Sequence, residues 1–148
     1  TGALASLLQM QGHVVIAVEP CARLRSAPAV TWISDTLPRL SKTRGRYDLV
    51  FCLGVLQHLA PLDQRRSVQR LARLLAPGGR LVLALRQGPA PKERRAWPMT
   101  SLLRAKNGLV MTRFVRRGSL QPGNRTHHVQ WTWVVLKRPK VTAKPPLR

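Results

Sequence analysis

The first 20 residues of the chain read TGALASLLQMQGHVVIAVEP, and they decide the fold. Three leucines share one face of a predicted helix over residues 3–11, and Gly12 follows at the position where a left-handed residue ends a helix. The unbroken apolar run 14–18 then predicts a strand buried on both faces, as strands of parallel sheets are. Glu19 comes directly after this strand. A helix that leads into a buried parallel strand is typical of α/β proteins.

Strands and helices continue to alternate along the chain. Apolar, β-rich runs predict five further strands, over residues 30–33, 47–53, 81–85, 109–115 and 129–136. Asp63 can cap a helix before the 81–85 strand, and Gly78-Gly79 is expected to end that helix. A polar linker with Gly and Pro joins the last two runs, which favours an antiparallel pair. We therefore expect a three-layer α/β domain over residues 1–138, with one sheet of six strands, and a basic, Pro-rich tail over residues 139–148.

The segment after the 81–85 strand is rich in Pro and Gly. Arg86 and Gln87 end the strand and are candidates to face a substrate. Residues 87–98 predict a loop long enough to cover a pocket, in which Trp97 is an anchor. Thr100 is placed to cap one more short helix.

Basic residues dominate the charge of the chain. The 26 Lys and Arg face only 5 Asp and Glu, so the formal net charge is +21 and attraction to polyanions is expected. The basic residues are spread from Arg23 to Arg148 rather than gathered in one block. This pattern fits either solvated surfaces of biased composition or contact with nucleic acid, membrane or an acidic partner. No base-reading motif is visible, so any nucleic-acid binding is expected to be non-specific.

Cysteine and histidine usage favours neither disulfides nor a metal. Cys21 and Cys52 are too few and too far apart for a disulfide framework, and His127-His128 lacks Cys or acid at metal-ligand spacing. No apolar stretch approaches the roughly 20 residues that span a bilayer, and the front of the chain lacks a basic and apolar leader. We expect a cytoplasmic protein with reduced thiols, no bound metal and no membrane partner.

The residues that follow each strand are the candidate site residues, because ligands of open α/β sheets bind at the carboxyl ends of the strands. Glu19 follows the first strand. An acid at that place accepts hydrogen bonds from two neighbouring ribose hydroxyls, which a carboxylate does well. The alternative is a surface Glu that begins a turn, but the scarcity of acid in this chain favours the binding role.

Three stretches resemble the class I, Rossmann-like methyltransferases that use S-adenosylmethionine. Residues 1–20 resemble the second half of their glycine-rich motif, with Thr1-Gly2 ending the loop and Glu19 as the ribose acid. YDLVFCLGVLQHL over 47–59 and LLAPGGRLVLAL over 74–85 resemble the fourth and fifth strands of the family with the helix that links them. The resemblance implies methyl transfer from S-adenosylmethionine to an acceptor. No motif in the sequence identifies that acceptor.

The resemblance also implies which residues hold the cofactor: Gly2, Glu19, Pro20, Asp35, Thr36, Leu37, Leu53, Gly54 and Val55. Asp35 would accept a hydrogen bond from the adenine amino group, with Thr36 and Leu37 along the ring. The equal alternative is an Asp that begins a turn. Leu53 and Gly54 would pass their backbone beside the methionine portion, since glycine permits close approach, and Val55 and Gln57 could add wall contacts.

His58 is a candidate to act as a base or to orient the substrate. The competing interpretation is a structural His in a short helix, because the sequence shows no carboxylate partner for it. A sulfonium leaving group is already activated, so methyl transfer does not depend on an acid–base pair. The catalytic residue therefore stays open at this point.

The sequence departs from the family at its front. The family opens with a central strand and two further glycines, and neither precedes Thr1 here. Loss of a central strand removes hydrogen bonds from both of its neighbours, so this chain by itself is expected to bind the cofactor feebly. Two other functions stay open: a non-catalytic, basic nucleic-acid-binding module derived from a methyltransferase, and a nicotinamide-dependent dehydrogenase that would share the acid after the strand.

Overall fold

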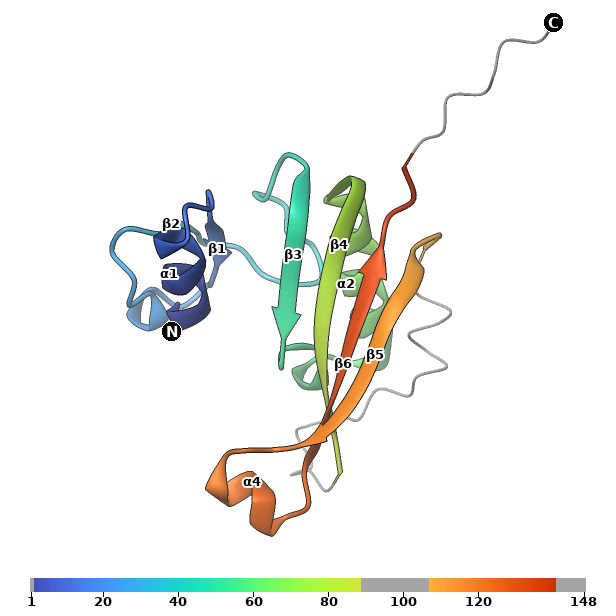
Figure 1. The fold of residues 1–148 in the computed structure, drawn as a ribbon. Coiled ribbons are helices and arrows are strands. Elements are labelled where there is room, and N and C mark those ends of the chain that lie inside the picture. Colours follow the sequence, from blue (N-terminus) through green and yellow to red (C-terminus); the bar gives the residue numbers. More distant parts are fainter. Residues whose placement is uncertain (1, 89–106, 141–148) are drawn as a thin grey trace, which may run out of the picture. The chain divides into compact units, whose positions relative to one another are not determined.

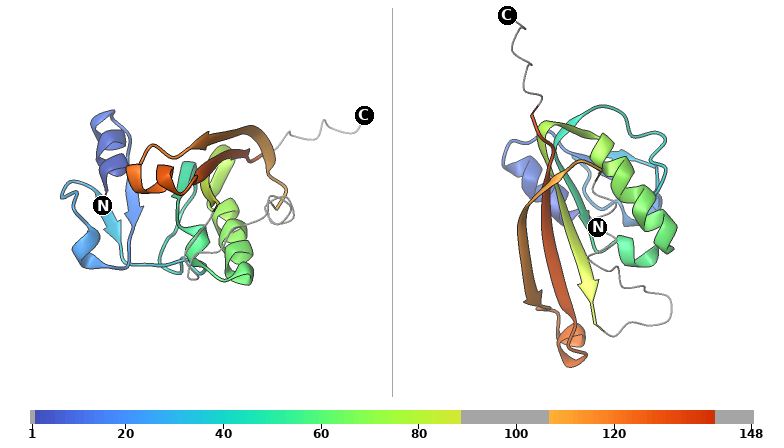
Figure 2. Two further views of the ribbon diagram at one scale, coloured as in Figure 1. Left: turned by 90° about the horizontal axis from the view of Figure 1, so that it is seen from below. Right: turned by 90° about the vertical axis from the view of Figure 1, so that its right-hand side faces the viewer.

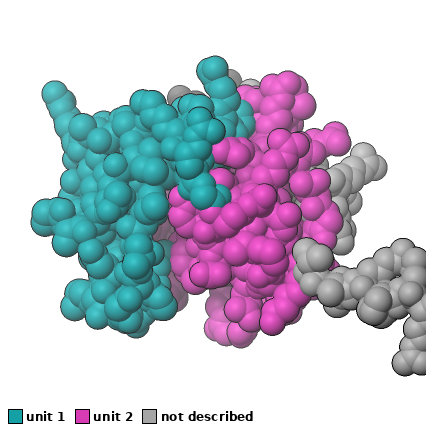
Figure 3. Space-filling model, turned by 90° about the horizontal axis from the view of Figure 1, so that it is seen from above, with its two compact units in different colours: residues 1–45 teal, residues 46–148 magenta. Residues whose placement is uncertain are grey.

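The computed structural model describes residues 2–88 and 107–140. The chain separates into two compact units, residues 1–45 and 46–148, which are coloured teal and magenta in Figure 3. All six predicted strands are present, but they form a two-stranded sheet, β1-β2, and a four-stranded sheet, β3-β4-β6-β5. The prediction of one six-stranded sheet is therefore wrong for the described residues. The single domain expected over residues 1–138 stays a prediction.

The division into two sheets has a topological cause. β1 and β3 are both edge strands, each with a hydrogen-bonded neighbour on one side only. A sheet is continuous only where neighbouring backbones exchange hydrogen bonds. The resembling family has a central strand with neighbours on both sides, and no strand within residues 2–88 and 107–140 takes that place.

The first unit is a helix beside a short parallel strand pair. Its elements are α1 (Ala3–Met10), β1 (Ile16–Val18), a 3-10 turn (Ala22–Leu24) and β2 (Thr31–Ile33). The helix begins at Ala3 and is followed by Gly12 in the left-handed conformation, at φ +86°, as predicted. β1 runs parallel to β2, with Ala17 opposite Trp32.

The first strand is shorter and more exposed than predicted. It begins at Ile16 rather than at Val14, whose side chain is fully exposed. Ile16 and Val18 each keep more than a third of their surface exposed. The prediction of burial on both faces is therefore wrong within this unit, because β1 is an edge strand with one short neighbour.

The second unit is a four-stranded sheet with a helix on one face (Figures 1 and 2). Its elements are β3 (Tyr47–Leu53), a 3-10 turn (Leu56–His58), α2 (Pro61–Arg73), β4 (Leu75–Gln87), β5 (Val110–Gly118), α4 (Pro122–Thr126) and β6 (Gln130–Lys137). β3 runs parallel to β4, and β6 runs antiparallel to both β4 and β5. The predicted closing antiparallel pair is confirmed.

Both predicted ends of α2 are wrong. The helix begins at Pro61, after Ala60, and Asp63 lies in its first turn without capping it. Pro suits a first helical position because the N–H that it lacks would have had no partner there. At the other end the helix stops at Arg73, and Gly78-Gly79 lies inside β4.

The two glycines belong to the sheet for a structural reason. The N–H of Gly78 donates to the carbonyl of Arg138 at 3.0 Å, and the N–H of Arg138 donates to the carbonyl of Gly79 at 2.9 Å. A Cβ added to Gly79 would lie 2.8 Å from the carbonyl oxygen of Tyr47, closer than side chains allow. Glycine is needed here so that the start of β4 can approach its neighbours closely.

The core of the second unit lies between α2 and one face of the sheet. Val68 and Leu71 of α2 are buried, as are Leu81 and Leu83 of β4. Val134 lies opposite Leu83 across the β4-β6 pair, so their side chains share this face. Figure 2 shows the helix lying against one face of this sheet.

Some predictions fall outside the described residues. These are the loop of residues 89–98, its Trp97, the helix expected after Thr100, and residues 141–148 of the tail. The polar linker predicted before the last strand contains α4. In the part of the chain that is described, no helix has the length and apolar character needed to cross a membrane.

Candidate functional site

Glu19 lies at the carboxyl end of β1, as the sequence analysis required. Its backbone N–H donates to the carbonyl of Ile33 in β2 at 3.1 Å, which continues the pairing of the two strands. One carboxylate oxygen, Oε1, accepts the N–H of Cys21 at 2.9 Å. The other oxygen has no hydrogen-bond partner among residues 2–88 and 107–140, and the residue is half-buried. The carboxylate is thus held by one oxygen, and its binding role stays a prediction.

Arg25 braces the turn that carries Glu19. Its Nε donates to the carbonyl of Glu19 at 2.9 Å, and its Nη2 donates to the carbonyl of Pro20 at 3.2 Å. These bonds fix the backbone of Glu19 and Pro20, and so they help to position the Glu19 side chain. The sequence analysis did not single out Arg25, because nothing in its local pattern distinguishes it from the other arginines.

Asp35 follows β2 and organises the loop after it. Both carboxylate oxygens accept hydrogen bonds from the loop, given by the N–H groups of Thr36, Ser41, Lys42 and Thr43 and by the hydroxyl of Thr43. These five bonds occupy a group that has about four lone-pair sites. The contacts support the interpretation of Asp35 as a loop-organising residue, and its role toward adenine stays a prediction.

The ionisation of Asp35 follows from the same contacts. Burial raises the pKa of its carboxyl, but hydrogen bonds from the N–H groups of Thr36, Lys42 and Thr43 and from the Thr43 hydroxyl outweigh that effect. The pKa of Asp35 therefore lies below its ordinary value. Beside it, the Thr36 hydroxyl donates to the carbonyl of Leu37 at 3.2 Å.

Gly2 stands at the start of α1 in a conformation that side chains avoid. Its φ is +81°, and a Cβ added to it would lie 3.0 Å from Ala27 and from the ring of Trp32. The Trp32 indole is fixed in turn, since its Nε1 donates to the carbonyl of Ala27 at 2.9 Å. The glycine that the family resemblance assigns to the cofactor loop therefore has a packing role in this unit.

In the second unit, Leu53 and Gly54 lie where β3 ends. The N–H of Gly54 donates to the carbonyl of Ala84 in β4 at 3.0 Å, so the two carboxyl ends are tied together. Gly54 has a φ of +66°, and a Cβ there would approach the ring of Trp131 to 3.2 Å. The left-handed conformation and the packing of Trp131 therefore both favour glycine at this position.

Gln57 adds a polar group next to Gly54. Its Nε2 donates to the carbonyl of Gly54 at 2.7 Å, and its side chain is buried. The carboxamide oxygen, Oε1, is buried without a hydrogen-bond partner. A buried acceptor of this kind is favourable only if a donor reaches it, from a ligand or from water. The unpartnered oxygen is stronger evidence for a binding role of Gln57 than the wall contact that the sequence suggested.

Val55 and His58 are exposed in the turn after Gly54. The backbone N–H of His58 donates to the carbonyl of Val55 at 3.0 Å. The imidazole has no hydrogen-bond partner, carboxylates included, within the described ranges. Its catalytic role therefore stays a prediction that no contact supports.

Cys52 does not serve as a nucleophile in this arrangement. Its thiol is buried beneath the end of β3, and burial raises its pKa to about 12. The thiolate is the reactive form of cysteine, so at neutral pH the group is protonated and inert.

The left-handed conformation of Gly54 gives a testable consequence for stability. Gly54→Ala is expected to lower the free energy of unfolding by about 1–2 kcal/mol, because an alanine is strained at positive φ and its Cβ meets Trp131. Chemical denaturation measures the change. Gly118→Ala is the control, since no atom lies within 4 Å of a Cβ there, and it should stay within about 0.5 kcal/mol of the parent. Equal unfolding midpoints for the two variants would contradict the prediction.

The structure brings the predicted site residues together in two groups, one in each unit. Gly2, Glu19, Pro20, Asp35, Thr36 and Leu37 belong to the first unit, and Leu53, Gly54, Val55 and His58 belong to the second. In the first unit, Glu19 and Asp35 both lie at the carboxyl end of a parallel strand pair, which is the end that binds ligands.

Solved structures of known methyltransferases have a similar fold. The magnesium protoporphyrin IX methyltransferase of Synechocystis PCC 6803, solved with S-adenosylmethionine, is 20% identical with a TM-score of 0.69, over 93% of this chain and 65% of that chain. The 1,6-didemethyltoxoflavin-N1-methyltransferase of Burkholderia thailandensis is 18% identical with a TM-score of 0.70, over 94% and 67%. The N-methyltransferase NodS of Bradyrhizobium japonicum WM9 is 17% identical with a TM-score of 0.69, over 94% and 74%.

These similarities show the fold, an α/β sheet of the Rossmann-like methyltransferase kind. The chain spans 65% of the length of the Synechocystis enzyme. No curated protein matches the chain in sequence. A family model described as a methyltransferase domain matches residues 1–121, which is most of the 148 residues. The chain therefore belongs to the methyltransferase-domain family.

Proposed function

We propose that this chain is an S-adenosylmethionine-dependent methyltransferase domain in which Glu19 holds the cofactor ribose. The observation that carries the proposal is the state of its carboxylate at the end of β1. One oxygen is anchored by the N–H of Cys21, and the other has no partner among the described residues. A carboxylate prepared in this way can accept hydrogen bonds from the vicinal hydroxyls of a ribose.

The second unit also offers groups that fit the cofactor. The absence of a side chain at Gly54 lets the indole of Trp131 pack on the backbone at the end of β3. The Oε1 atom of Gln57 is a buried acceptor without a donor, and the α-amino group of a methionine moiety is a donor of the needed kind. This acceptor supports a role for the β3 end in holding the amino-acid part of the cofactor.

Methyl transfer from a sulfonium requires little acid–base catalysis by the chain. S-adenosylmethionine, when bound, supplies a methyl group on an activated sulfonium. The contribution of Glu19 and Gln57 is to bind and orient the cofactor, and in-line displacement depends chiefly on such orientation. The absence of a carboxylate near His58 within the described residues does not weaken the proposal, since no proton relay is needed there.

A small-molecule acceptor is the better-supported substrate class. Two similar enzymes are known as methyltransferases of magnesium protoporphyrin IX and of 1,6-didemethyltoxoflavin. Both are small molecules with rings. These names support the same class for this chain, while the acceptor itself is left for experiment.

Parallel titrations test the cofactor. S-adenosylhomocysteine and NADH are titrated into the same protein, extended at its front by the strand and glycine loop of the Synechocystis enzyme. We expect binding of S-adenosylhomocysteine and none of NADH, because only the former matches the family and the closing antiparallel strands. Binding of NADH alone would favour the dehydrogenase and overturn the proposal.

A second candidate function is non-specific nucleic-acid binding, favoured by the net charge of +21. Unrelated single-stranded RNAs of one length are expected to bind with affinities that agree within about threefold and fall as salt rises, since phosphates rather than bases are contacted. Fluorescence anisotropy over a range of salt measures both. Strong discrimination between sequences that persists at high salt would refute this prediction.

A further inference from the structure

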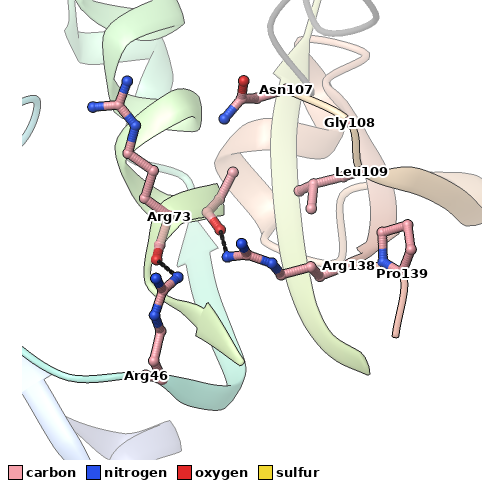
Figure 4. Close-up of a pocket in the computed structure, with 8 residues that line it drawn as sticks. Arg46, Arg73, Asn107, Gly108, Leu109, Arg138 and Pro139 are labelled. Atoms are coloured by element: carbon pink, nitrogen blue, oxygen red, sulfur yellow. Dashed lines mark hydrogen bonds between the residues drawn. The ribbon is translucent and has the colours of Figure 1, made fainter. Parts of the chain in front are cut away.

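A pocket of about 220 Å³ lies within the second unit, and arginines line it (Figure 4). Its walls are formed by Arg46, Ala72, Arg73, Asn107, Gly108, Leu109, Arg138 and Pro139. A volume of this size holds several water molecules, and so it can also hold a small polyanion. We call this site the arginine pocket.

Two of the arginines converge on the carboxyl end of α2. The Nη1 of Arg46 donates to the carbonyl of Arg73 and, at 3.4 Å, to that of Leu75. The Nη1 of Arg138 donates to the carbonyl of Leu75 at 3.0 Å and to that of Ala72 at 3.5 Å. Both cations thus share one acceptor oxygen, the carbonyl of Leu75, and lie close to each other.

These bonds leave donors available in the pocket. A guanidinium carries five N–H groups, and Arg46 and Arg138 each use a single nitrogen, Nη1, for the carbonyls. The Arg73 guanidinium makes no hydrogen bond to the described residues, and Figure 4 shows it extending away from that of Arg46. Arg46 and Arg138 thus lie together at the end of α2, and the Arg73 guanidinium lies apart from them.

Among the described residues, no carboxylate forms an ion pair with Arg46, Arg73 or Arg138. The acids of the second unit that are described are Asp48 and Asp63, and Asp63 pairs with Arg66 at 3.5 Å. Like charges held close together repel, and an anion placed between them relieves the repulsion. Guanidinium forks match phosphate oxygens in geometry as well as in charge.

The arginine pocket is separate from the proposed cofactor residues. The pocket is lined by the residue before β3, the end of α2 and the residues after β6. These segments lie at the amino end of the β3-β4 pair. Gly54 and Gln57 follow the opposite end of β3. A seven-residue strand spans about 20 Å, so the two places lie at opposite edges of the sheet.

We propose that the arginine pocket is a binding site for phosphate groups, with Arg46, Arg73 and Arg138 as its cationic walls. The spread of the three charges suits a ligand with more than one phosphate. Such groups occur in free phosphorylated compounds and in the backbone of a nucleic acid. The recognising chemistry is the same for both, and the probes of the experiment separate them.

The test is calorimetric titration of the whole chain with inorganic pyrophosphate in chloride buffer, and then with a ten-nucleotide single-stranded RNA. Arg73→Gln is the informative variant because its side chain makes no hydrogen bond that the described fold needs. We expect it to weaken binding about threefold to tenfold, the range for loss of one partly exposed charge-assisted contact. Arg65→Gln removes an equal charge from the exposed surface of the same helix and should change the affinity less than about twofold.

Each result decides a point. Pyrophosphate binding that depends on Arg73 supports the pocket and shows that a free phosphate compound suffices. RNA binding that depends on Arg73, without pyrophosphate binding, supports the pocket and makes the nucleic-acid backbone its source of phosphate. Equal weakening by Arg65→Gln, or no binding of either probe by the folded parent, overturns the proposal. Circular dichroism and thermal melting confirm that each variant is folded.

Discussion

Glu19→Ala is expected to weaken S-adenosylmethionine binding by about tenfold to a hundredfold. The measurement uses the chain extended by the strand and glycine loop described above. The variant removes the acceptor of the ribose hydroxyls, and hydrogen bonds to a charged group contribute about 1.5–3 kcal/mol. Calorimetric titration of parent and variant gives the two dissociation constants.

Two controls make this result specific to the carboxylate. Glu19→Asp keeps the charge on a shorter side chain and should lose less affinity than Glu19→Ala. Asp48→Ala removes an exposed acid of β3 and should leave the affinity unchanged, which tests for a general effect of charge. Equal affinity of parent and Glu19→Ala would remove Glu19 from the site and weaken the proposed function as a whole.

The elements that were predicted well are those defined by local pattern. β3 has the predicted bounds to the residue, because the β-rich run Tyr47–Leu53, apolar except for Asp48, stands between Arg46 and Gly54. The closing strands were found from their β-rich runs, and their antiparallel pairing followed from the linker. Glu19 directly follows β1 as predicted, because a position after a strand is itself a local feature, and its binding role stays a prediction.

The errors arise where one residue type serves two structures. A Gly-Gly pair such as Gly78-Gly79 often ends a helix, yet this pair lies in β4. The carbonyl of Tyr47 approaches Gly79 too closely for a side chain there. That contact joins residues far apart in the chain, and no local pattern reports it. Asp is a residue type that often caps the start of a helix, but here the helix already begins at Pro61, before Asp63.

The parts of the candidate site that were missed depend on tertiary contacts. Arg25 was missed, and Gln57 was predicted only as a wall contact, because the role of each depends on which backbone carbonyl it reaches. The arginine pocket likewise joins Arg46, Arg73 and Arg138 through carbonyls at the end of α2. In a chain with 26 basic residues, composition cannot distinguish these three from the others.

The loop after β2 should depend on the charge of Asp35. Asp35→Ala is expected to lower the stability of the first unit by about 3 kcal/mol, because four backbone N–H groups and a hydroxyl lose a charged acceptor in a buried place. Urea unfolding followed by tryptophan fluorescence measures this loss, with Trp32 as the tryptophan of residues 1–45. Asp48→Ala, which removes an exposed carboxylate, is the matched control and should change stability by less than about 0.5 kcal/mol.

The effect of Asp35 should also depend on pH in a definite direction. Its pKa is lower in the folded chain than the ordinary value of 3.8, so folding favours the ionised form. The stabilisation is therefore fully present above pH values near 3.8, and it is lost as pH falls through the lower pKa of the folded state. The difference in stability between the parent and Asp35→Ala should accordingly be constant near neutral pH and shrink in acid. A difference that stayed constant down to the most acidic pH at which the parent still folds, or one that grew, would show that the carboxylate charge does not hold the loop.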